Sequence, residues 1–192
     1  MEFINKYHIE KPGDIGVDED YIIKGSWVRG QGAGIKSETF KTIMDGLISS
    51  GRIAKTGNFF CLPSHKPETK GKEKDIEDAV LSLFQNRGFN PLKLDEILQI
   101  PYKKEDIKNV FQLLTKRGMV IKIVEDGYIS KDKLDEGRDK LVNLVADKGK
   151  IKAAEFRDIL GCGRKFAIEL LEYFDKERVT LRSGDYRVLR KR

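Results

Sequence analysis

A weak internal repeat limits the fold of this chain more than any other feature of its sequence. Apolar residues spaced i, i+3, i+4 and i+7 start at Phe40, again 67 residues later at Ile107, and again 60 residues later at Ala167. This spacing gives each segment one apolar helical face. Each segment is followed by two short β-type runs around a Gly-containing turn, which is a hairpin signal. We therefore expect three small, similar domains.

Further helices are expected before each long one. In the middle repeat, helical spacing runs from Asp75 to Arg87, and a short second helix at 94–98 must end before Pro101. The last repeat has the same order, with helices expected at 134–148 and 153–160. Three helices followed by a hairpin describe a winged helix. The predicted fold is α+β, mainly α: a tandem of three winged-helix domains, each three helices plus a small β-hairpin wing.

Composition gives the domain boundaries. The stretch around Pro63 and Pro67 is polar and lacks periodicity, which is typical of a linker. We expect a winged helix at 1–63, a linker at 64–73, and winged helices at 74–130 and 131–192. The second junction, after Ser130, is very short. The first two domains should therefore be hinged, and the last two more rigidly joined.

Positive charge is concentrated in the last repeat. The chain has a formal net charge of +6, and residues 131–192 carry 17 Lys and Arg against 12 Asp and Glu. The preceding residues carry 20 against 19, so they are nearly neutral. Only the last repeat has the electrostatic character of a polyanion binder.

The sequence gives little support for a metal site, a disulfide, a nucleotide-binding loop or a membrane span. Cys61 and Cys162 lie far apart without a metal or disulfide pattern, and His8 and His65 have no ligands at metal spacing. The glycine cluster at 30–34 lacks the Lys-Ser/Thr of a phosphate loop and is expected to be a turn. No apolar run approaches the roughly 18 residues of a membrane span. We expect no catalytic or metal site, no membrane association, and a cytoplasmic monomer.

Four runs in the last repeat carry a resemblance to a known family. They are 154–161, 163–167, 170–175 and 180–189, and they resemble the final winged helix of bacterial selenocysteine-specific elongation factors. The run 60–67 is similar to a join between earlier winged helices of that family. The resemblance covers the whole chain in architecture and about forty residues in specific sequence.

The resemblance implies a C-terminal extension of a translational GTPase. In that family the terminal winged helices bind the selenocysteine-insertion hairpin of messenger RNA, and the factor delivers selenocysteyl-tRNA to the ribosome at a UGA codon. No GxxxxGK[ST] loop occurs in this sequence. GTP and magnesium would therefore belong to another part of the factor, and these residues would be no enzyme and need no cofactor.

The expected RNA-binding surface lies on the last repeat. Residues 163–165 should begin its last helix, where free backbone N–H groups and the helix dipole favour a phosphate. Three wing arginines alternate with apolar residues, so they are expected to share the solvent face, while Val188 is expected in the core. The predicted RNA-binding residues are Arg157, Gly163, Arg164, Lys165, Arg182, Tyr186, Arg187 and Arg190.

Two positions depart from the family pattern. The last helix begins with Cys162 and Gly163, where the family has Thr-Ser, so a capping hydroxyl is lost. In the wing Tyr186 replaces a lysine, which exchanges a phosphate contact for a ring able to stack on a base.

Two other functions remain open. A winged-helix DNA-binding regulator would insert the same last helix into a major groove, although one basic repeat of three is a weak footprint. A protein-interaction scaffold would suit the two nearly neutral repeats.

Overall fold

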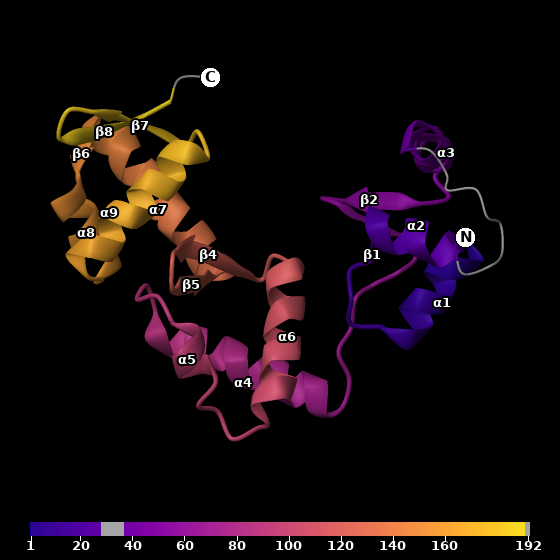
Figure 1. The fold of residues 1–192 in the computed structure, drawn as a ribbon. Helices are drawn as coiled ribbons and strands as arrows, with labels where there is room; N and C mark the ends of the chain where they lie inside the picture. Colours follow the sequence, from indigo (N-terminus) through magenta and orange to yellow (C-terminus); the bar gives the residue numbers. More distant parts are fainter. Residues whose placement is uncertain (28–36, 191–192) are drawn as a thin grey trace. The chain divides into compact units, whose positions relative to one another are not determined.

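The computed structural model describes residues 1–27 and 37–190, which are mainly helical with small antiparallel sheets (Figure 1). The chain divides into two compact units, Met1–Lys74 and Asp75–Arg192. The glycine cluster at 30–34 lies outside the described residues. Among the helices of the described part, none is long and apolar enough to cross a membrane.

The first unit packs three helices against a three-stranded sheet. In chain order it contains α1 (Glu2–Glu10), β1 (Val17–Asp18), α2 (Glu19–Trp27), α3 (Ser37–Ser49), β2 (Ala54–Thr56) and β3 (Phe59–Cys61). The sheet order is β1-β3-β2. Phe40 and Met44 of α3 are buried, and the Phe40 ring meets that of Phe60 edge-on at 6.1 Å. Ile43, expected on the same face, is 50% exposed, so the apolar face of α3 is narrower than its spacing suggests.

The expected linker lies against this first unit. The His65 imidazole Nε2 is 2.7 Å from the backbone oxygen of Asp14, and the Glu68 N–H donates to the oxygen of Pro12. Helix α4 (Lys72–Arg87) begins within the expected linker range. Residues 64–71 therefore form no helix or strand, yet they are held by hydrogen bonds.

The second unit begins with three helices and a hairpin. After α4 come α5 (Leu94–Ile97), α6 (Lys104–Lys116), β4 (Val120–Val124) and β5 (Gly127–Ser130). The four apolar residues predicted for α6 are all buried, in one cluster with residues of α4. Gly118 follows the end of α6 with a φ of 68°, a conformation that costs glycine little.

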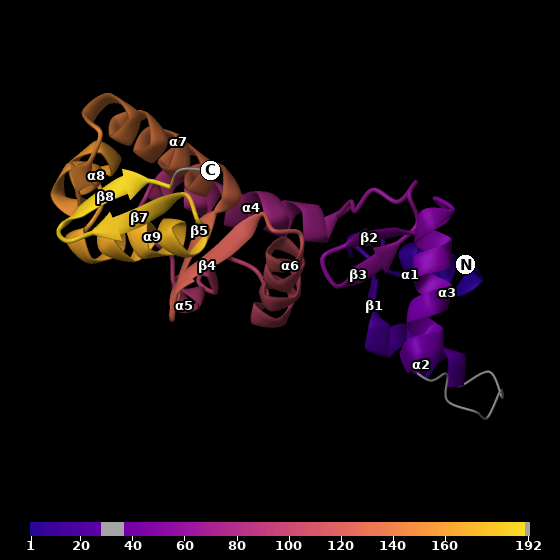
Figure 2. The ribbon, with the colours of Figure 1, turned by 90° about the horizontal axis from the view of Figure 1, so that it is seen from above.

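The same order then recurs with one more strand. The elements are α7 (Lys131–Lys148), β6 (Ile151–Lys152), α8 (Ala153–Leu160), α9 (Arg164–Lys176), β7 (Thr180–Ser183) and β8 (Tyr186–Leu189). The sheet order is β6-β8-β7, with the β7–β8 hairpin on the outer side of the unit and α9 beneath it (Figures 1 and 2). Phe166, Leu170 and Phe174 of α9 are buried, as their spacing predicted.

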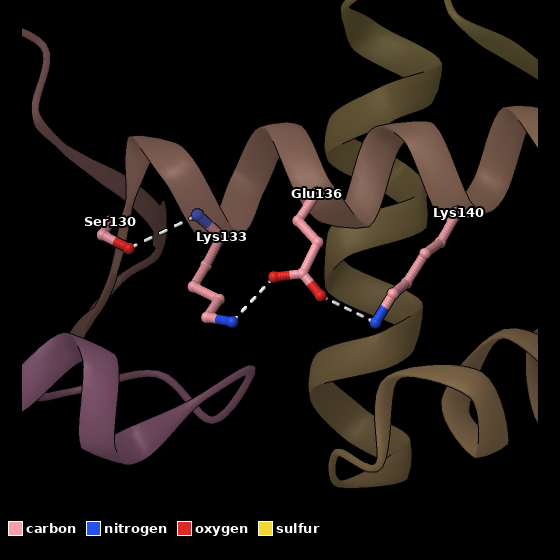
Figure 3. A network of polar contacts seen from close by, with 4 residues as sticks. All are labelled: Ser130, Lys133, Glu136 and Lys140. Atoms are coloured by element: carbon pink, nitrogen blue, oxygen red, sulfur yellow. Dashed lines mark hydrogen bonds and ion pairs between the residues drawn. The ribbon is translucent and has the colours of Figure 1, made fainter.

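A short junction joins these two parts of the second unit. Ser130 ends β5 and also caps α7, where its hydroxyl oxygen accepts a hydrogen bond from the Lys133 N–H. The Glu136 carboxylate accepts hydrogen bonds from the side chains of both Lys133 and Lys140 (Figure 3). The two ammonium groups also lie 5.4 and 5.0 Å from the ring centre of Phe89. Phe89 follows α4, yet it packs in the core of the later elements. The elements on either side of the junction therefore share one apolar core.

Candidate nucleic-acid interface

The turn between α8 and α9 presents an uncapped helix start. Gly161, the C-cap that follows α8, is in the left-handed conformation, with φ 63°. Gly163 is the N-cap of α9, in an extended conformation and without a side-chain cap. The first backbone N–H groups of α9 point away from the helix with the positive end of its dipole, which favours an anion. Residues 163–165 therefore lie at the start of the last helix, as the sequence predicted.

The cations beside this helix start differ in how free they are. Arg164 is exposed, and the Lys165 side chain is 91% exposed, with its ammonium 3.8 Å from Glu169. Arg157 on α8 instead donates to the carboxylate of Asp158, including an Nε contact of 2.8 Å. An exposed ion pair of this kind contributes little to the stability of the fold. The Arg157 guanidinium remains at the surface, but the carboxylate of Asp158 partly neutralises its charge.

The prediction that Arg187 faces solvent is wrong. Arg187 is only 5% exposed, and its Nε donates to Asp175 of α9 at 2.7 Å. The Thr180 hydroxyl donates to the other oxygen of the same carboxylate at 2.6 Å. This buried group of three ties both strands of the wing to the end of α9. Arg187 is therefore unavailable for nucleic acid.

The prediction that Val188 lies in the core is wrong for the same reason. Ile151 pairs with Arg187 across the sheet, and Thr180 pairs with Leu189. These four residues share the inner face, because side chains alternate along a strand. Val188 is half-buried and stands outside the core cluster, whereas Leu189 packs against it. The charged Arg187 takes an inner position because Asp175 lies beneath it.

The other wing cations are exposed. The Arg182 Nε donates to the backbone oxygen of Gly184 at 3.2 Å, which folds the side chain over its own turn. Arg190 follows β8 and is exposed, while its N–H donates to the oxygen of Val179. The wing therefore keeps two surface arginines of the three expected.

Tyr186 lies beside two lysines that sequence reasoning missed. It pairs across the sheet with Lys152, whose ammonium is 5.2 Å from the ring centre; the ammonium of Lys150 is 4.4 Å away. A lysine this close to a ring face is attracted by the ring's quadrupole. The missed signal is the alternation of basic residues at 148, 150 and 152 just before the predicted α8.

A groove of about 730 Å³ adjoins the start of α9. Gly163, Lys165 and Phe166 line one side, and the β4–β5 turn at 124–127 lines the other. Arg87 and Lys93 add positive charge, and Glu96, Glu125, Asp126 and Glu169 add negative charge. This mixed charge makes the groove a poorer anion site than the open helix start.

The cysteines and His8 have structural surroundings that explain their burial or altered pKa. Burial raises the pKa of both Cys61 and Cys162, which makes them poor nucleophiles. His8 is buried, and burial, with a smaller contribution from the charge of His65, lowers its pKa to about 4. Among the described residues no group of three or more His, Cys, Asp or Glu could hold a metal ion.

Comparisons with known proteins agree on one family. The family model "Elongation factor SelB, winged helix" matches residues 143–189. The chain is 27% identical over its whole length to a selenocysteine-specific elongation factor of Desulfomicrobium baculatum, and spans 30% of that protein. It is 30% identical, over 77% of its length, to the Escherichia coli factor, and spans 24% of it. The chain thus spans less than a third of these relatives.

Two of the solved structures that are similar to this chain bear on its fold and function. The mRNA-binding domain of elongation factor SelB from E. coli, solved in complex with SECIS RNA, has 29% identity and a TM-score of 0.52 over 64% of this chain. A bacterial selenocysteine-specific elongation factor EF-Sec, with 22% identity, a TM-score of 0.51 and 99% coverage of this chain, supports the fold alone. Together with the matched winged helix, these similarities show that the chain is homologous to the C-terminal region of selenocysteine-specific elongation factors.

Proposed function

We propose that residues 131–192 bind the selenocysteine-insertion hairpin of a messenger RNA, and that this binding directs selenocysteine incorporation at a UGA codon. The observation that carries the proposal is the uncapped start of α9, with Gly163 at its N-cap and the exposed cations Arg164 and Lys165 beside it. A related mRNA-binding domain has been solved with SECIS RNA. Arg157, Arg182, Tyr186 and Arg190 complete the proposed contact surface.

The chemistry of A-form RNA supports a contact of this kind. Base edges in an A-form helix lie in a deep groove that side chains cannot enter, so sequence must be read from unpaired bases. A helix start binds a backbone phosphate without reading sequence and can set the register of the hairpin. We therefore assign residues 163–165 to phosphate binding and leave base recognition to the rest of the surface.

The rest of the chain is proposed to be a spacer made of two further winged helices, at 1–63 and 74–130, with 64–73 between them. The support is the recurrence of helices followed by a hairpin, each set with its own apolar cluster. In the complete factor, GTP, magnesium, selenocysteyl-tRNA and ribosome contacts would belong to the remaining part. The protein would then act as a monomer in the cytoplasm.

The test is the binding of a fluorescent messenger hairpin, measured by anisotropy over a range of salt concentrations. Arg164→Ala with Lys165→Ala should weaken binding and reduce the slope of log affinity against log salt by roughly one to two phosphate equivalents. Lys104→Ala with Lys108→Ala is the matched control, because these exposed lysines lie on α6 and remove the same charge. An unchanged salt slope in the first variant would place the contact elsewhere.

Two competitor experiments separate the alternatives. A DNA duplex of matched length that binds as tightly as the hairpin would favour a DNA-binding regulator, since the α9 start could also grip DNA phosphates. Absence of binding to either nucleic acid at low salt would favour a protein-interaction scaffold.

A further inference from the structure

We propose that the outer face of the β6-β8-β7 sheet is a second RNA-contacting site, which binds unpaired nucleotides by stacking a base on Tyr186 and holding phosphates with Lys150 and Lys152. This inference rests on the proposed function for the class of ligand. It adds a site that is separate from the start of α9 and that binds unpaired nucleotides instead of the phosphates of the hairpin.

The strand register defines this outer face. Lys152 pairs with Tyr186, and Tyr186 pairs with Ser183, which puts one residue from each strand in a single row across the sheet. The next row contains Leu181 paired with Val188. Arg187 and Ile151 occupy the alternate positions and face the helices, so the Tyr186 row faces away from them. Figure 2 looks onto this hairpin, with α9 behind it.

The composition of the face suits a single-stranded nucleic acid. Leu181 is 47% exposed, and Tyr186 and Val188 are half-buried, so the face offers an apolar and aromatic floor. Lys150 and Lys152 flank the ring, and no strand position on this face carries an acid. Bases stack on aromatic rings whatever their identity, and cations beside the ring can follow the backbone. The combination complements unpaired nucleotides better than a paired duplex, whose bases are already stacked.

The nearby acid is already engaged. Glu155 accepts a hydrogen bond from the Lys152 backbone N–H at 2.8 Å and pairs with the Lys148 ammonium at 2.6 Å. Its charge is therefore offset by Lys148, and the side chains of Lys150 and Lys152 remain directed over Tyr186. Asp185, in the turn, is exposed and lies between two arginines in sequence order, Arg182 and Arg187.

The outer face and the start of α9 are separate. Arg187, next to Tyr186, is anchored at Asp175, near the C-terminal end of α9. Twelve residues of helix separate Asp175 from Gly163, which corresponds to about 18 Å. A paired stem held at the start of α9 and a single strand held at the sheet could therefore be bound by the same domain at once.

Three RNA probes test the site with the full 192-residue chain. One is the blunt messenger hairpin, and the other two carry six unpaired nucleotides at the 5′ or the 3′ end. At least one extended hairpin should bind roughly tenfold more tightly than the blunt one, as expected for stacking of one or two bases. Tyr186→Ala should abolish that gain, and Tyr186→Phe should keep it. The readout is the ratio of the affinities for the extended and the blunt hairpin, because Tyr186 also belongs to the proposed hairpin surface.

The lysines have their own readout. Lys150→Ala with Lys152→Ala should reduce the salt slope of the extended hairpin by roughly 0.7 for each single-strand phosphate released, without changing the slope for the blunt hairpin. The control pair on α6, Lys104→Ala with Lys108→Ala, should change neither. Thermal unfolding curves that match the unsubstituted chain would verify that each variant is folded.

The possible results separate this proposal from the proposed function. Equal affinity for blunt and extended hairpins, or an equal loss on both in Tyr186→Ala, would overturn the second site and leave hairpin binding intact. Failure to bind the blunt hairpin would overturn the proposed function; a single-stranded ten-nucleotide RNA, with and without Tyr186→Ala, would then test the face directly. Displacement of the extension by polyglutamate as readily as by single-stranded RNA would mean that charge alone is recognised, and stacking would be rejected.

Discussion

The ion pair between Arg187 and Asp175 fixes the wing of the C-terminal winged helix to the end of α9. Both side chains are largely buried, and Thr180 supplies a further hydrogen bond to the same carboxylate. Removing one partner of a buried pair leaves an uncompensated charge, which destabilises far more than loss of a surface pair. The pair therefore helps to position the neighbouring wing residues Arg182 and Tyr186.

Substitution of Arg187 should change stability before it changes binding chemistry. Arg187→Met should lower the free energy of unfolding of the second unit by about 3 kcal/mol, because Asp175 would remain charged and poorly solvated. Adding Asp175→Asn should recover part of the loss, since the amide is uncharged and can still accept from Thr180. Urea unfolding followed by circular dichroism measures both. Normal stability combined with a reduced salt slope for RNA would instead make Arg187 a phosphate contact.

At the scale of elements, the three helices that precede the hairpins, α3, α6 and α9, end in two different ways. Gly51 and Gly118 follow the first two in the left-handed conformation, each with a φ of 68°. Arg178 takes the equivalent place after α9, with a φ of 60°. A left-handed conformation costs a residue with a side chain roughly 1 kcal/mol, whereas glycine adopts it readily. The backbone at the end of α9 is therefore more strained than the backbone at the ends of α3 and α6.

A reciprocal pair of substitutions tests this strain. Arg178→Gly should raise the free energy of unfolding by roughly 0.5 to 1 kcal/mol, and Gly118→Arg should lower it by about 1 kcal/mol. No heavy atom lies within 4 Å of a Cβ added at Gly118, so the second effect would come from the backbone and not from a clash. Chemical denaturation of both variants gives the comparison. A loss of stability in Arg178→Gly would show that the arginine side chain contributes more than its backbone costs.

At the scale of the whole molecule, the two units have separate apolar cores, and the first contains a buried histidine. In the first unit the His8 ring stacks on that of His65 at 3.6 Å, and Tyr7 donates to Asp14 beside them at 2.8 Å. The pKa of His8 is lowered to about 4, chiefly by burial and further by His65, from an ordinary value of 6.5. The unfolded chain therefore binds more protons than the folded one between these two values.

The first unit should consequently lose stability as the pH falls from 6.5 toward 4, by about 3 kcal/mol in total, and should be unaffected by His8 above pH 7. Urea unfolding followed by far-UV circular dichroism at pH 7 and pH 5 should show the loss. His8→Phe should remove most of it; an equal loss in that variant would assign the effect to other groups.

Much of the architecture follows from local rules. The spacing of Ile107, Val110, Phe111 and Leu114 predicted a buried face, and all four are buried because a helix repeats every 3.6 residues. Helix α8 has the bounds that its sequence predicted. The orientation of the wing was harder to predict from sequence. Two-residue alternation shows which residues share a face of the sheet, but it does not show which face is buried. For that reason the sequence prediction placed Val188 in the core and Arg187 at the surface, whereas the structure buries Arg187 and leaves Val188 outside the core cluster.

The sequence by itself determined the order of helices and hairpins, the concentration of positive charge in the last repeat, and the residues at the start of α9. These depend on neighbours within a few positions, where periodicity and capping act. The tertiary structure alone decided that Asp175 draws Arg187 inward, that Phe89 packs beneath α7, and that Lys150 and Lys152 flank Tyr186. Each of these joins residues 12 or more apart in sequence, or depends on which sheet face is buried. Such contacts are set by packing rather than by local preference.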